Sequence, residues 1–179
     1  MVVSGLDETC YEAPDPAQLT ARLAQAKAEA VAGRDQAAGA LVLGCDSLLE
    51  LDGGAYGKPA DAAAAVERWR LLRNRRALLH TGHHLIDTDG PSAIGRVEST
   101  VVLFGDPTDA EIEAYVSTGE PLAVAGGFTI DGRGGAFVAG IEGNPSNVIG
   151  LSIPALRAML AVLGISYTDL WTPDLWTSG

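Results

Sequence analysis

Lysine is the residue that this 179-residue chain almost lacks, with only Lys27 and Lys58 among its 12 basic residues. With 23 acidic residues, the formal net charge is −11. A general nucleic-acid binder needs a basic face, so we expect no nucleic-acid partner. A small anionic ligand is not excluded, because it needs only a local group of donors or a bridging metal. The two lysines are therefore candidate anion ligands, with ordinary surface lysines as the alternative.

Long apolar runs and cysteines are also scarce. No apolar stretch reaches the length of a membrane span, and the N-terminus has no basic-then-apolar signal pattern. The sequence therefore predicts a cytoplasmic protein without a membrane partner. The two cysteines, Cys10 and Cys45, have no metal-binding spacing. We expect both to be small buried apolar residues rather than a disulfide.

Helical and strand patterns alternate along the chain, which is typical of an α/β fold in one domain over 1–179. Capping residues predict helices that follow Asp15, Asp61 and Thr108, and an apolar pattern predicts a fourth over 153–163. Apolar runs and alternation predict the strands. They are 40–43, 77–87 with an interruption at 81–82, 95–104, a hairpin of 128–130 with 136–141, and an edge strand ending near 171, with 143–150 as a loop.

The stretch 40–59 organises the functional prediction. Its first apolar run is predicted to be a buried strand that stops at Gly44, so that Asp46 follows the carboxyl end of the strand. Open α/β sheets place their chemistry at that position, and the alternative is an acid that caps a turn. Lys58 near the end of the stretch is followed by Pro59, where a Walker A motif needs Ser or Thr. The stretch is therefore not a P-loop.

Two acids and the two lysines form the candidate constellation. Lys27 shares a predicted helix face with Leu19 and Leu23, from which it either snorkels to the surface or reaches into a cleft. Glu8 and Asp46 are the candidate acids. Carboxylates bind hard divalent cations through oxygen, and lysines neutralise phosphate oxygens. The pattern thus favours a metal-assisted site for a phosphate compound if the four residues meet.

Histidine and serine chemistry is less well supported. His80 and His84 share one face of a predicted strand, which would allow a metal site, but ordinary strand histidines are favoured over it. Ser99 and Ser152 lack the context of a nucleophile elbow, which argues against an acyl-transfer triad.

Eight segments in order resemble the Maf family of nucleoside triphosphate pyrophosphatases. They are SGLDE at 4–8, LAQAKAEAV at 23–31, GCDSLLELDG at 44–53, YGKP at 56–59, LHTG at 79–82, EIEAYVSTGEP at 111–121, AGGFTIDG at 125–132 and IEGNPSNVIGL at 141–151. Together they cover nearly the whole chain. The resemblance implies an elongated, two-lobed α/β fold with a mixed sheet, flanking helices and a central cleft.

The resemblance also implies a reaction. A nucleoside triphosphate would be cleaved between its α and β phosphates to the monophosphate and pyrophosphate, with Mg²⁺ or Mn²⁺, in the cytoplasm. By position, Asp46 matches the family's proton acceptor, Glu8 its cleft acid, and Lys27 and Lys58 its cleft lysines. Asp46 and Glu8 would share the metal. The resemblance leaves the oligomeric state open between a monomer and a homodimer.

The resemblance does not determine which nucleotide base is preferred. Ser47 and Asp131 fall on positions linked to it, and Asp131 stands where many members have Gln. Many members also carry His at the position of Ala77. The subfamilies prefer either dTTP and UTP or a modified nucleotide, and Ser47 with Asp131 matches neither pattern.

The start of the chain is the largest departure. Family members usually begin with a strand and a Ser-Pro-Arg-Arg loop ahead of the matching part, so this chain is expected to be N-terminally truncated relative to the family. We expect an unpaired sheet edge, and slow or absent hydrolysis that an upstream Ser-Pro-Arg-Arg block would rescue. The alternative is a non-catalytic or impaired regulator of cell division. A turnover assay that detects pyrophosphate separates the two.

Overall fold

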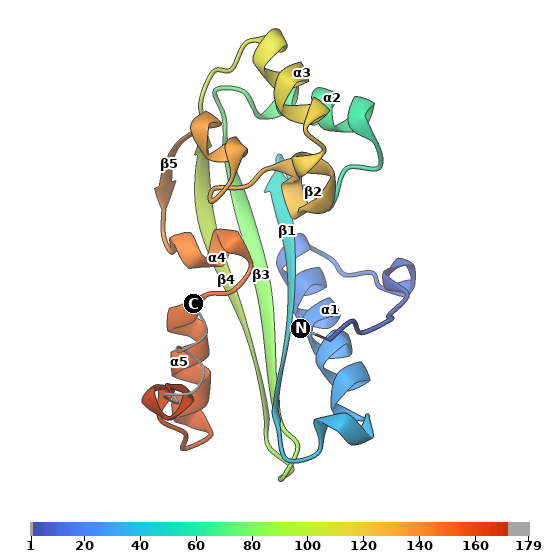
Figure 1. Ribbon diagram of the computed structural model, residues 1–179, viewed down its shortest axis with the longest axis vertical. Helices are drawn as coiled ribbons and strands as arrows, with labels where there is room; N and C mark the ends of the chain where they lie inside the picture. Colours follow the sequence, from blue (N-terminus) through green and yellow to red (C-terminus); the bar gives the residue numbers. More distant parts are fainter. Residues whose placement is uncertain (1, 172–179) are drawn as a thin grey trace.

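Three long strands run along the length of the molecule (Figure 1). The structure is a computed structural model in which residues 2–171 are described. The long strands are β1 (Leu41–Leu51), β3 (Arg76–Asp87) and β4 (Ala93–Phe104). The short strands β2 (Gly54–Tyr56) and β5 (Val138–Glu142) complete a five-stranded sheet in the order β2-β1-β3-β4-β5. The predicted α/β fold, a sheet flanked by helices, is confirmed.

All pairings in this sheet are antiparallel, so the expectation of a mixed sheet is wrong for the described residues. The connections explain the direction of the strands. Short turns at 52–53 and 88–92 join β1 to β2 and β3 to β4 as hairpins, whereas a parallel pair needs a long crossover. β2 pairs only with residues 49–51 of β1, so residues 41–48 have a strand neighbour only on the β3 side within 2–171. The expected unpaired sheet edge is therefore present.

Helices cover both faces of the sheet. α1 (Pro16–Ala32) packs on one face, where its Ala28 joins Val42 and Ile86 in an apolar cluster. Successive strand residues point to opposite faces, and α5 (Ile153–Val162) packs against the alternate residues Leu43 and Leu85 on the other face. The short α4 (Pro145–Ile149) contacts β3 and β4 beside it.

A third apolar cluster fills the opposite end of the molecule, where α2 (Ala62–Leu72) and α3 (Asp109–Ser117) lie together (Figure 1). The fully buried Trp69 is at its centre and makes edge contacts with Phe104 and Tyr115. Its indole N–H donates to the carbonyl of Gly127, 2.8 Å away. Buried aromatic pairs of this kind contribute about 0.5–1.5 kcal/mol each beyond their buried area. None of the helices described over 2–171 is both long and apolar enough to cross a membrane.

All four predicted helices are confirmed, and their start signals are local. Asp15, Asp61 and Thr108 each accept a hydrogen bond from a backbone N–H of the first turn, and the Thr108–Glu111 capping box is complete. The helix predicted over 153–163 is α5, with Ser152 as its cap.

Several other expectations are wrong. The segment 128–130 is not a strand; the short 3₁₀ turns η4 (Ala125–Gly127) and η5 (Arg133–Phe137) precede β5, because left-handed glycines turn the backbone away from a ladder. The predicted loop 143–150 contains α4, capped by Asn144. The predicted edge strand is the 3₁₀ turn η6 (Tyr167–Leu170), started by a local capping box. Cys10 is exposed and Cys45 only partly buried, and both are free thiols.

Gly44 and Gly82 do not interrupt their strands, contrary to the prediction. β1 and β3 run through them, and both glycines lie where α1 crosses the sheet. A Cβ atom at Gly44 would be 2.2 Å from the carbonyl oxygen of Ala24, and one at Gly82 would be 2.2 Å from that of Thr20. In both cases the atom that blocks the added Cβ belongs to the backbone of α1, so a side-chain rotation cannot relieve the clash. Glycine at these positions allows the helix to approach the sheet closely.

We therefore expect Gly82→Ala to lower the free energy of unfolding by about 3 kcal/mol, because α1 must move off the sheet to admit one methyl group. Urea titration followed by circular dichroism measures the change. Gly33→Ala is the matched control, since a Cβ at that position would make an ordinary van der Waals contact, 3.6 Å from the carbonyl oxygen of Glu29. That variant is expected to stay within about 0.5 kcal/mol of the parent. Equal unfolding midpoints for the two variants would contradict this account of the helix crossing.

Candidate active site

Three of the predicted site residues meet where α1 crosses β1. The ammonium nitrogen of Lys27 lies 2.5 Å from Asp46 Oδ1 and 2.8 Å from Glu8 Oε1. Lys27 comes from α1, Asp46 from β1, and Glu8 from the 3₁₀ turn η1 (Glu8–Cys10) near the N-terminus. The side chain of Asp46 is only 10% exposed, whereas that of Glu8 is 51% exposed. The cluster therefore has a buried acid, a shared cation and a solvent-facing acid.

The position of Asp46 differs from the prediction. It lies in the middle of β1, not past the carboxyl end of a strand. It shares a strand face with Val42 and Gly44, which places its carboxylate under α1. Because Gly44 lets the helix approach, Lys27 reaches Asp46 instead of extending into solvent.

Burial and charge act together on this cluster. Burial raises the pKa of Asp46 above its ordinary value of 3.8, although the hydrogen bond and charge of Lys27 oppose that shift. Burial lowers the pKa of Lys27, but its hydrogen bonds to Asp46 and Glu8 outweigh burial and place the pKa above 10.5. Lys27 therefore stays a cation at neutral pH. Asp46 is a stronger base than a solvent-exposed aspartate.

The second lysine approaches the same cluster without joining it. Lys58 is exposed and lies in the connector between β2 and α2. It lines a groove together with Glu8 and Lys27, and its positive charge lowers the pKa of Asp46. No ion pair of Lys58 is present among residues 2–171. Its charge is thus free to act on an anion in the groove.

This groove has a volume of about 1170 Å³ and follows the unpaired edge of β1. Its charged end carries the two lysines and Glu8, and the rest is mainly apolar. Residues 40–45 line it along β1, and Ile149 and Leu151 are also among its lining residues. An extended ligand with an anionic part and a flat apolar part suits such a groove.

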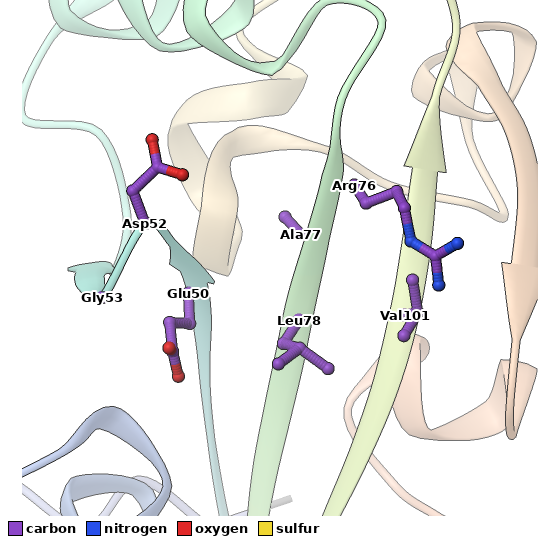
Figure 2. A pocket seen from close by; sticks show the side chains of 7 residues that line it. All are labelled: Glu50, Asp52, Gly53, Arg76, Ala77, Leu78 and Val101. Carbon is purple, nitrogen blue, oxygen red and sulfur yellow. The ribbon is translucent and has the colours of Figure 1, made fainter.

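A smaller hollow of about 370 Å³ lies on the sheet away from these residues (Figure 2). Figure 2 shows Glu50, Leu78 and Val101 side by side across three strands, with Arg76 at one margin. None of the predicted site residues lines it. Glu50 also binds His80, whose other ring nitrogen lies 2.7 Å from Ser99 Oγ. His80 is therefore engaged in hydrogen bonds within the sheet.

The structure does not bring Ser47 and Asp131 to the cluster. Ser47 follows Asp46 on the strand and so points to the opposite face, where its hydroxyl lies 2.9 Å from that of Thr81. Asp131 is exposed, in the loop between η4 and η5. No hydrogen bond or ion pair joins Asp131 to the other predicted residues in the described part of the chain. The roles of both residues in base preference stay predictions.

Glu120 is an interaction centre that the sequence analysis missed. Its Oε1 accepts hydrogen bonds from the hydroxyl of Thr129 at 2.6 Å and from the N–H of Gly134 at 3.1 Å. The hydrogen bond from Thr129 is the main reason that the pKa of Glu120 falls to about 2. Glu120 therefore fixes the loop that carries Asp131. Thr129 and Gly134 lie outside the local sequence neighbourhood of Glu120, so no local pattern could predict these hydrogen bonds.

Comparison with known proteins gives a consistent result. The family profile described as Maf-like protein matches residues 1–163. A protein of Streptomyces avermitilis named nucleoside triphosphate pyrophosphatase is 53% identical over 173 residues, which cover 97% of this chain and 84% of the relative. Relatives of the same name from Streptomyces coelicolor and Thermosynechococcus vestitus are 54% and 52% identical, and cover 97% and 93% of this chain and 84% of each relative.

Proposed function

The chain belongs to the Maf-like protein family, and from this membership we propose that it is a nucleoside triphosphate pyrophosphatase. The reaction is hydrolysis of a nucleoside triphosphate to the monophosphate and pyrophosphate. The observation that carries the proposal is the ion-paired cluster of Asp46, Lys27 and Glu8, of which Lys27 and Glu8 line the groove together with Lys58. We place the reaction in the cytoplasm and in a single Maf-like domain.

In the proposed reaction, water attacks the α phosphorus and Asp46 takes its proton. The bond from the α phosphorus to the bridging oxygen breaks, and pyrophosphate leaves with that oxygen. Lys27 occupies Asp46 Oδ1, which leaves Oδ2 for the water. The raised pKa of Asp46 suits a general base, because proton transfer becomes more favourable as the base strengthens. Lys58 would neutralise phosphate oxygens along the groove.

A divalent cation fits this site only when it binds together with the nucleotide. Residues 2–171 contain no group of three or more His, Cys, Asp or Glu that could hold a metal ion. Asp46 and Glu8 nevertheless converge on one cation, the Lys27 ammonium. Mg²⁺ is commonly held by one or two carboxylates, with waters and substrate phosphates as its remaining ligands. When bound, Mg²⁺ or Mn²⁺ would neutralise the charge that develops on the leaving pyrophosphate.

We expect excess EDTA to abolish turnover and leave the melting temperature of the nucleotide-free protein unchanged. Both results follow from a metal that arrives with the substrate and does not hold the fold together. Pyrophosphate release and a thermal scan, each with and without chelator and after Mg²⁺ is restored, provide the measurement. Full turnover in excess EDTA would remove the metal from the mechanism. A large loss of melting temperature would indicate a resident metal instead.

The direct test of the proposed function is a panel of nucleoside triphosphates with Mg²⁺, in which dTTP, UTP and 7-methyl-GTP are compared. We expect pyrophosphate above background from at least one of them, at the slow rate expected from the sequence. The shape of the groove does not favour one base over another, so the panel also determines the base preference. Absence of pyrophosphate from the whole panel would contradict the proposal and favour a non-catalytic role.

A further inference from the structure

The peptide just before Lys58 is held by two donors from distant parts of the chain. The carbonyl oxygen of Gly57 accepts from a terminal guanidinium nitrogen of Arg68 at 2.5 Å and from the N–H of Gly126 at 3.1 Å. The Arg68 guanidinium also lies 5.1 Å from the ring centroid of Tyr56, the residue before Gly57. A ring face attracts a cation at this distance. Arg68 therefore binds two consecutive residues that lead into Lys58.

Pro59, the residue after Lys58, is held through Trp69, which follows Arg68 in α2. Trp69, fully buried in the core, donates to the carbonyl of Gly127. Gly127 in turn lies so close to Pro59 that a Cβ on it would be 3.0 Å from the proline ring. Two successive residues of α2 thus hold the connector before and after Lys58. The helix itself is anchored by the aromatic core.

Arg68 differs from the neighbouring arginines of the same region. Arg70 and Arg73 pair with Asp109 on the surface. Arg68 is half-buried and makes no ion pair among residues 2–171. Burial lowers its pKa below the ordinary value of an arginine. A partly desolvated guanidinium without a carboxylate is unfavourable unless hydrogen bonds compensate it, so the bond to Gly57 is a specific feature of this site.

We propose that Arg68 is a positioning residue for Lys58: it fixes the Gly57 peptide so that the lysine ammonium faces the groove beside Asp46. The proposal rests on the proposed function, because Lys58 would there neutralise the triphosphate. Arg68 acts through the backbone of the connector and needs no contact with the nucleotide. Its effect on catalysis should therefore disappear when Lys58 is absent.

The first test is a double-mutant cycle on pyrophosphate release. Arg68→Met keeps most of the aliphatic packing and removes the donor, and we expect kcat/KM to fall about 10- to 100-fold, as small misplacements of catalytic groups do. In a Lys58→Met background the same substitution should cost less than about twofold. Arg70→Met is the matched control on the same helix, with no contact to Gly57 and no expected effect on kcat/KM. An equal loss from Arg68→Met in both backgrounds would overturn the proposal.

The second test does not depend on turnover. Because the chain has only two lysines, reductive ¹³C-methylation gives two lysine signals besides the N-terminal amine. We expect Arg68→Met to change the chemical shift or linewidth of Lys58 and leave Lys27 unchanged, with Arg70→Met matching the parent at both. Urea titration confirms that each variant is folded. An unaltered Lys58 signal in the folded Arg68→Met variant would overturn the positioning role. Absence of turnover in the parent would instead count against the proposed function alone.

Discussion

Asp46→Asn is expected to lower kcat for pyrophosphate release by about 10²- to 10⁴-fold, the usual contribution of a general base. Asparagine keeps the shape of the side chain and can still accept a hydrogen bond from Lys27, but its amide cannot take a proton from water. The loss should appear in kcat more than in KM, because the carboxylate acts on the attacking water. Steady-state kinetics with a saturating nucleotide measures it.

Asp52→Asn is the matched control for that substitution. Asp52 is an exposed carboxylate in the turn after β1 that pairs with Arg75, far from the lysine cluster along the strand. Its loss should change kcat by less than about twofold, since exposed ion pairs contribute little. If Asp46→Asn retained more than a tenth of the parent kcat, Asp46 would not be the base.

Lys27→Met is the second substitution with a large expected effect. It removes the only cation that contacts both Asp46 and Glu8 within the described residues, and leaves two acids side by side. Charge-assisted hydrogen bonds contribute about 1.5–3 kcal/mol each, so loss of each bond could lower kcat/KM about 10- to 100-fold. Lys27→Arg is the matched variant, because it keeps the positive charge at nearly the same reach. We expect it to recover part of the activity.

The pH profile gives Lys27→Met a signature that a folding defect would not. Burial places the pKa of Asp46 above 3.8, and the hydrogen bond and charge of Lys27 hold it down. The active form is the carboxylate, so kcat/KM should fall as the pH drops through that raised pKa. Without Lys27 the pKa rises further, and the acid limb should move to higher pH. An acid limb at the same pH in Lys27→Met and the parent would contradict the role of this ion pair.

Sequence patterns predicted the features that depend on near neighbours. The helix starts at Asp15, Asp61 and Thr108 were predictable because each cap binds its own first turn. The meeting of Lys27 with Asp46 was a prediction from family resemblance, since a spacing of four along a helix does not say what that face contacts. The extent of β1 was mispredicted because Gly44 looks like a strand terminator unless the crossing helix is known.

Long-range contacts could not be predicted in the same way. Asp46 and Ser47 are adjacent in sequence, yet strand alternation sends them to opposite faces, which only the continuous β1 reveals. Arg68 binds the carbonyl of Gly57, and Glu120 binds the N–H of Gly134 besides the hydroxyl of Thr129; any residue type supplies such backbone groups. A side chain that binds distant backbone leaves no partner residue to recognise. Such residues become visible only when the chain is folded.

The measurement that tests the central claim most directly is hydrolysis in H₂¹⁸O with Mg²⁺ and the preferred nucleoside triphosphate. Mass spectrometry of the products shows both which anhydride is cleaved and which phosphorus water attacks. We predict nucleoside monophosphate and pyrophosphate in equal amounts, with one ¹⁸O in the monophosphate and none in the pyrophosphate, and at least about 10²-fold slower formation of both with Asp46→Asn. Nucleoside diphosphate with orthophosphate, or ¹⁸O in the pyrophosphate, would contradict the account.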